Sequence, residues 1–134
     1  MTITQLRTQE LRHHLDPHLA AMPADPWWLV TRTHQFAAAA GITVDVVLDA
    51  VTWCRRTGLQ VGRWWAGAAF VGEPGARVPV PLIYLNRQLC PTRGQAELVI
   101  VHEMMHARWP SYGHRKIAFD RAQQLLDVVP APRS

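Results

Sequence analysis

The chain has 134 residues, of which 49% are hydrophobic and 18% charged, and this composition excludes a disordered protein. Its length predicts one domain with a single core. The net charge is +4, and Lys116 is the only lysine among fourteen basic residues. Such an excess of Arg is explained either by a GC-rich genome or by an acidic partner such as nucleic acid.

Two cysteines, Cys54 and Cys90, lie outside any CxxC motif, which excludes a zinc ribbon and a dithiol redox site. The first residues are polar and His-rich rather than typical of a secretion signal. No apolar run is long enough to span a membrane. We therefore expect a cytoplasmic protein with reduced thiols and no membrane contact.

Residues 3–15 are predicted to form the first helix, which Pro17 ends. His13, His14 and His18 lie close together in the sequence and suggest a metal site. Pro17 interrupts the helical face that would pair the second and third of these histidines. We therefore expect a solvated cluster.

Two further helices are predicted to form a packed hairpin. Asp25 is a strong N-cap with Pro26 at the first helical position, and Gly41 ends that helix. Thr43 is predicted to begin another helix, with apolar residues at helical spacing, that Gly58 ends. The pair resembles a helix-turn-helix only weakly, because its second member has few polar side chains with which to contact base edges.

Residues 62–71 and 77–85 are predicted to be strands, because they are rich in aromatic and β-branched residues. The GEPGA segment between them is typical of a hairpin connection. Pro79 and Pro81 cannot donate hydrogen bonds to a ladder, so the second strand is predicted to lie at an edge of the sheet, at least in its first half.

Trp64 and Trp65 in the first predicted strand are suited to stacking on nucleobases. Adjacent residues of a strand point to opposite faces of the sheet. We therefore expect one ring in the core and the other on a neighbouring surface.

Thr92 and Gln95 form a predicted capping box, so a helix should begin near Arg93. It should end near Arg108, because Pro110 follows. From Leu98 to Met105 this helix is apolar apart from one His and one Glu, which predicts burial on all sides. A last helix is predicted from the helical spacing of Ala118, Ala122, Leu125, Leu126 and Val129.

The predicted buried helix carries an HExxH motif, His102-Glu103-Met-Met-His106. Two His at i and i+4 lie on one helical face and can bind one zinc ion, while the Glu is placed to act as general base on a water molecule that the metal activates. A catalytic zinc usually has a third protein ligand. The metzincin and thermolysin-like spacings are absent, which leaves His114, Asp120 and Asp127 as possible third ligands. His114 is preferred and Asp120 is the alternative, whereas Asp127 is expected to be solvated.

The segments IYLNRQL, ELVIVHEMMHA and GHRKIAF together resemble the SprT-like, HExxH…H (gluzincin-type) zinc metallopeptidases. The resemblance covers about half of the chain, roughly residues 62–126. It implies one Zn²⁺ held by His102, His106 and His114, with Glu103 as catalytic base. It also implies a peptide or protein substrate that lies extended along an edge strand formed by Val80, Leu82, Ile83, Tyr84 and Leu85.

An acyl-transfer site also needs a group that stabilises the developing negative charge, and Tyr112 and Arg115, which flank His114, are the candidates. Together these features predict a minimal zincin-like α+β domain, with a helical part over residues 1–58 and a strand and metal-site part over residues 59–129. The predicted function is that of a zinc metalloendopeptidase. The alternative is a zinc-stabilised protein with a peptidase-like fold that binds nucleic acid or another partner.

Overall fold

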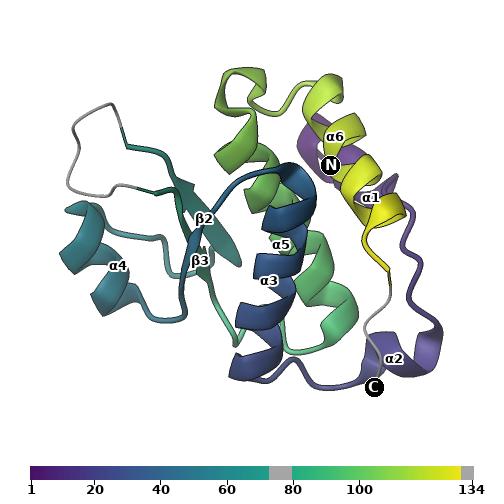
Figure 1. Cartoon of the computed structure of the whole chain (residues 1–134), viewed down its shortest axis with the longest axis horizontal. Helices are drawn as coiled ribbons and strands as arrows, with labels where there is room; N and C mark the ends of the chain where they lie inside the picture. The colour runs from purple at the N-terminus through teal and green to yellow at the C-terminus, as the bar shows by residue number, and fades with distance from the viewer. Residues whose placement is uncertain (73–79, 131–134) are drawn as a thin grey trace.

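The computed structural model describes residues 1–72 and 80–130, and in this part the chain is a mixed α+β fold with six α-helices and one small sheet. Figure 1 shows helix α5 in the middle, with the sheet on one side of it and α1, α3 and α6 on the others. The elements are α1 (Ile3–Gln9), α2 (Pro17–Ala21), α3 (Pro26–Ala40), β1 (Asp45–Val47), α4 (Ala50–Thr57), β2 (Gly67–Phe70), β3 (Leu82–Leu85), α5 (Arg93–Arg108), a 3₁₀ turn η1 (Pro110–Tyr112) and α6 (Lys116–Val128). No helix of the described part is long and apolar enough to cross a bilayer.

The predicted first helix, residues 3–15, is wrong in its second half. Helix α1 ends at Gln9, and a second short helix, α2, begins at Pro17. The side chain of Asp16 accepts a hydrogen bond from the backbone N–H of Leu19, and Pro17 occupies the first helical position. The proline that was expected to end a helix therefore begins one.

Helix α3 confirms the prediction for its segment, with Asp25 as N-cap and Gly41 in the left-handed conformation at its end. The helix predicted to follow, between Thr43 and Gly58, is wrong in its first part. The chain instead forms strand β1, and helix α4 begins only after its N-cap Asp49. The β-branched residues before Asp49 favour a strand, so no helical hairpin and no helix-turn-helix forms here.

The sheet has the order β1-β3-β2, with β1 parallel and β2 antiparallel to β3. The predicted antiparallel pairing is confirmed, but the prediction that residues 80–85 form an edge strand is wrong. β3 can be the central strand because Pro81 precedes the ladder instead of lying within it. The carbonyl oxygen of Pro81 accepts a hydrogen bond from Asp45 N–H at 2.9 Å. Most of the GEPGA segment, together with Pro79, lies outside the described residues.

All four residues of β3 are buried, because helices cover both faces of the sheet. Leu82 and Tyr84 pack with Trp53 of α4 on one face, whereas Ile83 and Leu85 join the main core with α3, α5 and α6 on the other. A strand that is buried on both faces shows a continuous apolar run rather than alternation. This arrangement leaves β1 and β2 as the edges of the sheet in the described part.

Helix α5 begins and ends at the predicted residues, and the side chain of Thr92 accepts a hydrogen bond from Gln95 N–H. It is not enclosed on all sides, since eight of its sixteen residues are buried and both histidines of the HExxH motif are partly exposed. Helix α6 buries the predicted apolar face against α5. The consequence is a helix whose inner side is core and whose partly exposed side carries the two histidines of the motif.

Candidate metal centre

Helix α5 and the loop after it bring three histidines together. His102 and His106 lie one helical turn apart, with ring centroids separated by 4.9 Å. His114 follows η1, and its ring centroid lies 5.2 Å from that of His102 and 4.6 Å from that of His106. The predicted histidine triad is therefore assembled in space.

Gly113 directs the chain back towards α5. Its φ of 54° and ψ of −132° belong to a region that essentially only glycine occupies. The guanidinium of Arg115 closes the same loop by donating hydrogen bonds to the carbonyl oxygens of Tyr112, at 3.2 Å, and Ser111, at 3.1 Å. The third histidine is thus positioned by backbone geometry and not by secondary structure of its own.

The three Nε2 atoms of the triad form a nearly equilateral triangle. The separations are 3.2 Å for His102–His114, 3.2 Å for His102–His106 and 3.0 Å for His106–His114. Each nitrogen is either a donor or an acceptor, so at least one of the three pairs must join two like groups. Hydrogen bonds cannot satisfy this arrangement, whereas a shared cation can.

The triangle fits a tetrahedral zinc ion. With Zn–N bonds of about 2.0–2.1 Å, neighbouring ligand atoms in a tetrahedron lie about 3.3 Å apart. The observed separations are within a few tenths of an ångström of this spacing. Three imidazole ligands with one position left open are the ligand set of a catalytic rather than a structural site.

The protonation state of His102 and His106 also suits a cation. Burial, followed by the neighbouring His106 and His114, lowers the pKa of His102 to about 4, and burial lowers the pKa of His106. Both imidazoles are therefore neutral at physiological pH. Neutral imidazole is the form that binds metals.

The acidic alternatives to His114 are engaged elsewhere. The carboxylate of Asp120, the alternative third ligand, accepts a hydrogen bond from Lys116 Nζ at 3.1 Å on the exposed side of α6. Asp127 lies 2.6 Å from His14 Nε2. Within the described residues, the triad is the only group of three His, Cys, Asp or Glu side chains close enough to share an ion.

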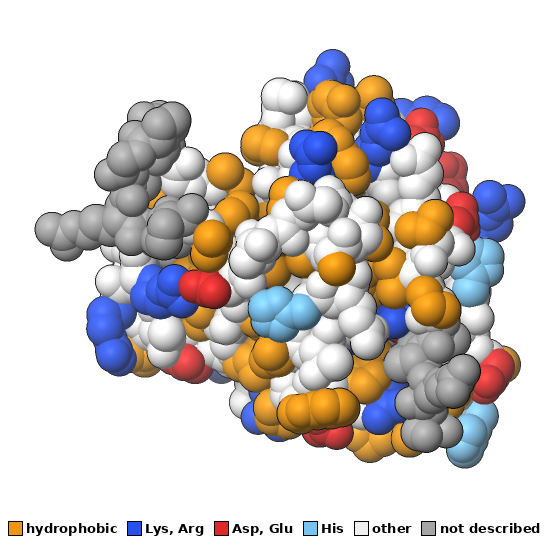
Figure 2. All heavy atoms as spheres, viewed as in Figure 1, with side chains coloured by type: hydrophobic (Ala, Val, Ile, Leu, Met, Phe, Trp, Pro, Cys, Tyr) orange, Lys and Arg blue, Asp and Glu red, His pale blue; other side chains and the backbone are white. Residues whose placement is uncertain are grey.

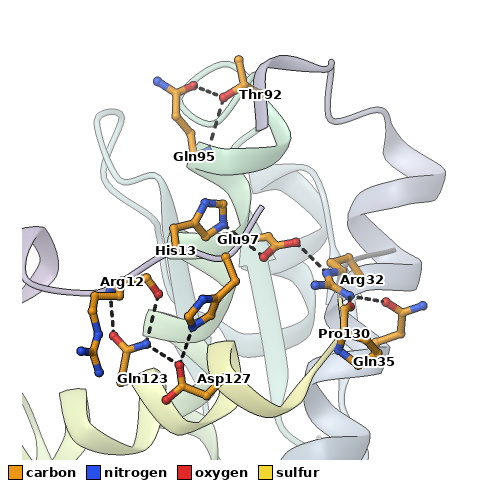
Figure 3. A network of polar contacts seen from close by, with 11 residues as sticks. Arg12, His13, Arg32, Gln35, Thr92, Gln95, Glu97, Gln123, Asp127 and Pro130 are labelled. Carbon is orange, nitrogen blue, oxygen red and sulfur yellow. Dashed lines mark hydrogen bonds and ion pairs between the residues drawn. The ribbon is translucent and has the colours of Figure 1, made fainter. Parts of the chain in front are cut away.

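The three N-terminal histidines do not gather into a site. His13 Nε2 lies 3.2 Å from a carboxylate oxygen of Glu97 on α5, and the other oxygen of Glu97 accepts a hydrogen bond from Arg32 Nε at 2.8 Å (Figure 3). His14 instead contacts Asp127 of α6. His14 is exposed as expected, whereas the expected solvation is wrong for His13, whose side chain is largely buried. Both residues tie the N-terminal segment to the body of the fold.

Glu103 lies on the inner side of α5 and is only 8% exposed. Burial raises the pKa of its carboxyl group to about 8. His102 and Glu103 line one cavity of about 280 Å³ beside strand β2. A buried carboxyl group with a raised pKa beside metal-binding side chains is suited to accept and return a proton near neutral pH.

Gly67 of β2 is the reason that α5 can approach the sheet so closely. A Cβ atom at this position would lie 2.9 Å from Glu103 Cγ, 2.9 Å from Val99 Cγ1 and 3.0 Å from the carbonyl oxygen of Tyr84. Contacts this short require the helix or the strand to move. The glycine therefore sets the position of Glu103, and the sequence held no signal of this role beyond an isolated glycine in a strand.

Gly67→Ala is expected to destabilise the fold by about 1–3 kcal/mol, because it overpacks the junction of β2 and α5, and to lower any Glu103-dependent activity per folded molecule. Urea unfolding and rate measurements on the same sample check both effects. Gly94→Ala is the matched control: its Cβ would meet Ala20 at 3.1 Å, nine residues before Glu103 in the same helix. An equal loss of activity in both variants would contradict the role of Gly67.

Two further contacts support the triad. The ring of Phe119, which is buried in α6, lies 5.6 Å from the ring of His102 and 6.4 Å from that of His114. Arg7 of α1 donates a hydrogen bond from Nη1 to the carbonyl oxygen of His114 at 2.5 Å. This hydrogen bond joins residues more than a hundred positions apart, so no local sequence pattern could have predicted it.

Trp64 and Trp65 differ from the expectation of one core ring and one surface ring. They are 75% and 52% exposed, because the strand predicted to contain them begins only at Gly67. Arg63 lies over the ring of Trp64 at 5.1 Å. On the face shown in Figure 2, Lys and Arg side chains form separate groups rather than one continuous patch.

The two candidates for stabilising a developing negative charge lie in the loop that carries His114. The guanidinium of Arg115 is engaged by two carbonyl oxygens of this loop and lies 5.8 Å from the ring centre of Tyr112. Tyr112 is partly exposed.

Comparison of the chain with protein-family models, curated proteins and solved structures finds no match.

Proposed function

We propose that the protein is a zinc-dependent metallopeptidase with a minimal zincin-like fold, similar to the SprT-like peptidases. The observation that carries the proposal is the triangle of Nε2 atoms at 3.0–3.2 Å, with a buried glutamate one residue after the first ligand. His102, His106 and His114 would hold one Zn²⁺. The ion would polarise the substrate carbonyl and favour attack by water at neutral pH.

Within this proposal each side chain has a defined task. Glu103 takes a proton from the attacking water and returns it to the leaving amine, which its raised pKa favours. Tyr112 and Arg115 stay the candidates for stabilising the charge on the carbonyl oxygen. Gly67 holds β2 against the helix that carries Glu103.

The substrate would lie along β2 and not along β3 as the sequence suggested. β3 is paired on both sides, whereas β2 is an edge strand of the described sheet and packs against α5. An extended peptide can add to such an edge through backbone hydrogen bonds. Because Gly67 also lines the cavity with His102 and Glu103, a peptide on this edge would pass the candidate metal centre.

Metal removal and replacement test the proposal. Protein stripped with a chelator is expected to lose hydrolysis of an unfolded protein such as casein, and one equivalent of Zn²⁺ should restore it. New amino termini report the cleavage, and protein stripped and reloaded with Mg²⁺ alone is the control. Hydrolysis that continues in samples shown by elemental analysis to lack metal would contradict a zinc mechanism.

The alternative is a zinc-stabilised protein that binds nucleic acid. The exposure of Trp64 and Trp65, and the guanidinium of Arg63 over the first of these rings, favour it. In this alternative, nucleic-acid binding requires both tryptophans and weakens steeply as the salt concentration rises, which is not expected of the peptidase.

A further inference from the structure

An apolar cavity adjoins the candidate metal centre. It has a volume of about 280 Å³, and His102 and Glu103 form one part of its wall. The remainder comes from the loop before β2, from β2 itself, from α5 and from α1. These lining residues are Trp65, Ala66, Gly67, Leu98, Val99 and Thr8.

The lining indicates the chemistry of the occupant. Apart from Thr8 and the two residues of the HExxH motif, every residue of the wall is apolar. The volume is just below the range of about 300–1,000 Å³ typical of sites for drug-sized ligands, so it suits one or two side chains rather than a folded partner. An apolar cavity beside groups that act on a peptide bond is suited to an apolar side chain of the peptide.

Trp65 is the residue of this wall whose exposure demands an explanation. It is 52% exposed, and its backbone N–H donates a hydrogen bond to Gly62 O at 3.1 Å in a tight turn. A Cβ atom at Gly62 would lie 2.5 Å from Trp65 Nε1, so the indole rests directly on the glycine backbone. The ring is therefore held in place while much of its apolar surface faces solvent.

The neighbouring Trp64 provides an internal comparison. It is 75% exposed and lies under the guanidinium of Arg63, but it does not line the cavity. The two adjacent tryptophans are thus both exposed but have different surroundings. Only Trp65 is placed to contact a ligand that also reaches Glu103.

We propose that Trp65 determines substrate specificity by forming one wall of a subsite for a large apolar side chain, such as Leu or Phe, next to the bond that is cut. This inference rests on the proposed peptidase function and adds a substrate class, unfolded segments with exposed apolar residues. Folded proteins bury most such residues, so the subsite would direct the enzyme towards unfolded chains.

The kinetic test uses quenched fluorescent peptides that differ only at one position beside the cleaved bond, with Leu, Phe, Ser or Asp there. Trp65→Ala is expected to lower kcat/KM for the Leu and Phe peptides about 10–200-fold, the range for lost apolar contacts in a pocket. The Ser and Asp peptides should change little, and Trp64→Ala should leave the preference intact. Equal effects of both variants, or an unchanged preference in Trp65→Ala, would overturn the proposal.

A binding arm separates this inference from the proposed function. Zinc-loaded Glu103→Gln protein, with and without Trp65→Ala, is titrated with the Leu and Ser peptides in a calorimeter. If the Glu103→Gln protein binds the Leu peptide more tightly than the Ser peptide, and the added Trp65→Ala change abolishes this difference, the result supports the subsite. It does so even if the wild-type protein cleaves nothing and the peptidase function fails. Equal binding of both peptides overturns the subsite.

A nucleic-acid arm completes the design. Binding of oligo(dT) that falls equally in Trp64→Ala and Trp65→Ala, and that weakens steeply with salt, would assign both rings to base stacking and overturn the subsite. Absence of such binding at low salt supports the peptide assignment. Circular dichroism and urea unfolding of each variant confirm that the fold is retained.

Discussion

Glu103→Gln is expected to lower peptide hydrolysis by at least about 100-fold, the lower limit for loss of a general acid–base group, while one zinc per chain is retained. The amide has almost the shape of the carboxyl group but cannot accept and return a proton. The zinc ligands are untouched, because the group that would share the ion consists of the three histidines and does not include Glu103. Elemental analysis and rates measured on the same sample check both parts.

Stability provides a control that the variant is folded. Burial raises the pKa of Glu103 from its ordinary 4.5 to about 8, so the folded protein favours the neutral form. As pH rises from 4.5 to 8, the unfolded chain loses this proton first, and metal-free wild-type protein loses stability across this window. Gln stays neutral, so the metal-free variant should be at least as stable as wild type at pH 8.

The exposed Glu10 provides the matched control for this substitution. Glu10→Gln should leave both hydrolysis and zinc content unchanged. A Glu103→Gln protein that binds zinc and cleaves peptides at the wild-type rate would show that the assigned mechanism is wrong. A variant that has lost zinc would instead place the carboxyl group among the metal ligands.

His114→Ala is expected to weaken zinc binding strongly, because it removes one of three ligands. Loss of a residue that only supports a ligand costs roughly 10–100-fold in metal affinity, and the loss of a ligand should exceed this range. The fold should survive, since His114 is exposed in a loop. Competition with a chromophoric chelator measures the affinity, and thermal unfolding with and without zinc reports the coupled loss of stabilisation.

Two substitutions make the result specific to the triad. Asp120→Asn tests the alternative third ligand, whose carboxylate contacts Lys116 in the structure, and it should leave the affinity unchanged. His34→Ala removes an exposed histidine of α3 and controls for loss of any imidazole. Zinc held as tightly by His114→Ala as by wild type would remove His114 from the ligand set.

Local signals predicted several elements well, because the energy of each signal is contained within a few residues. Thr92, which caps α5, is one example, and Asp25 with Pro26 at the start of α3 is another. The spacing of the two histidines in the motif also needs only one helical turn, so it placed both rings on one side of α5.

Predictions failed where pairing partners decided the outcome. The apolar spacing after Thr43 was compatible with a helix, but residues 45–47 form a strand because β3 lies beside them to accept the pairing. Pro81 was expected to keep residues 82–85 at the edge, but it lies just outside the ladder, and β3 has partners on both sides. Distant segments supply these partners, and a local pattern contains no information about them.

The sequence by itself determined that α5 would begin after Thr92, end at Arg108 and present His102 and His106 together, since hydrogen bonds and side-chain spacing within one helix suffice for this. Only the tertiary structure decided that His114 completes a triangle of nitrogen atoms, that Gly67 brings β2 against Glu103, and that Trp65 lines the adjoining cavity. These features depend on how separate elements pack. Packing is set by the fit of whole surfaces rather than by the residues of one segment.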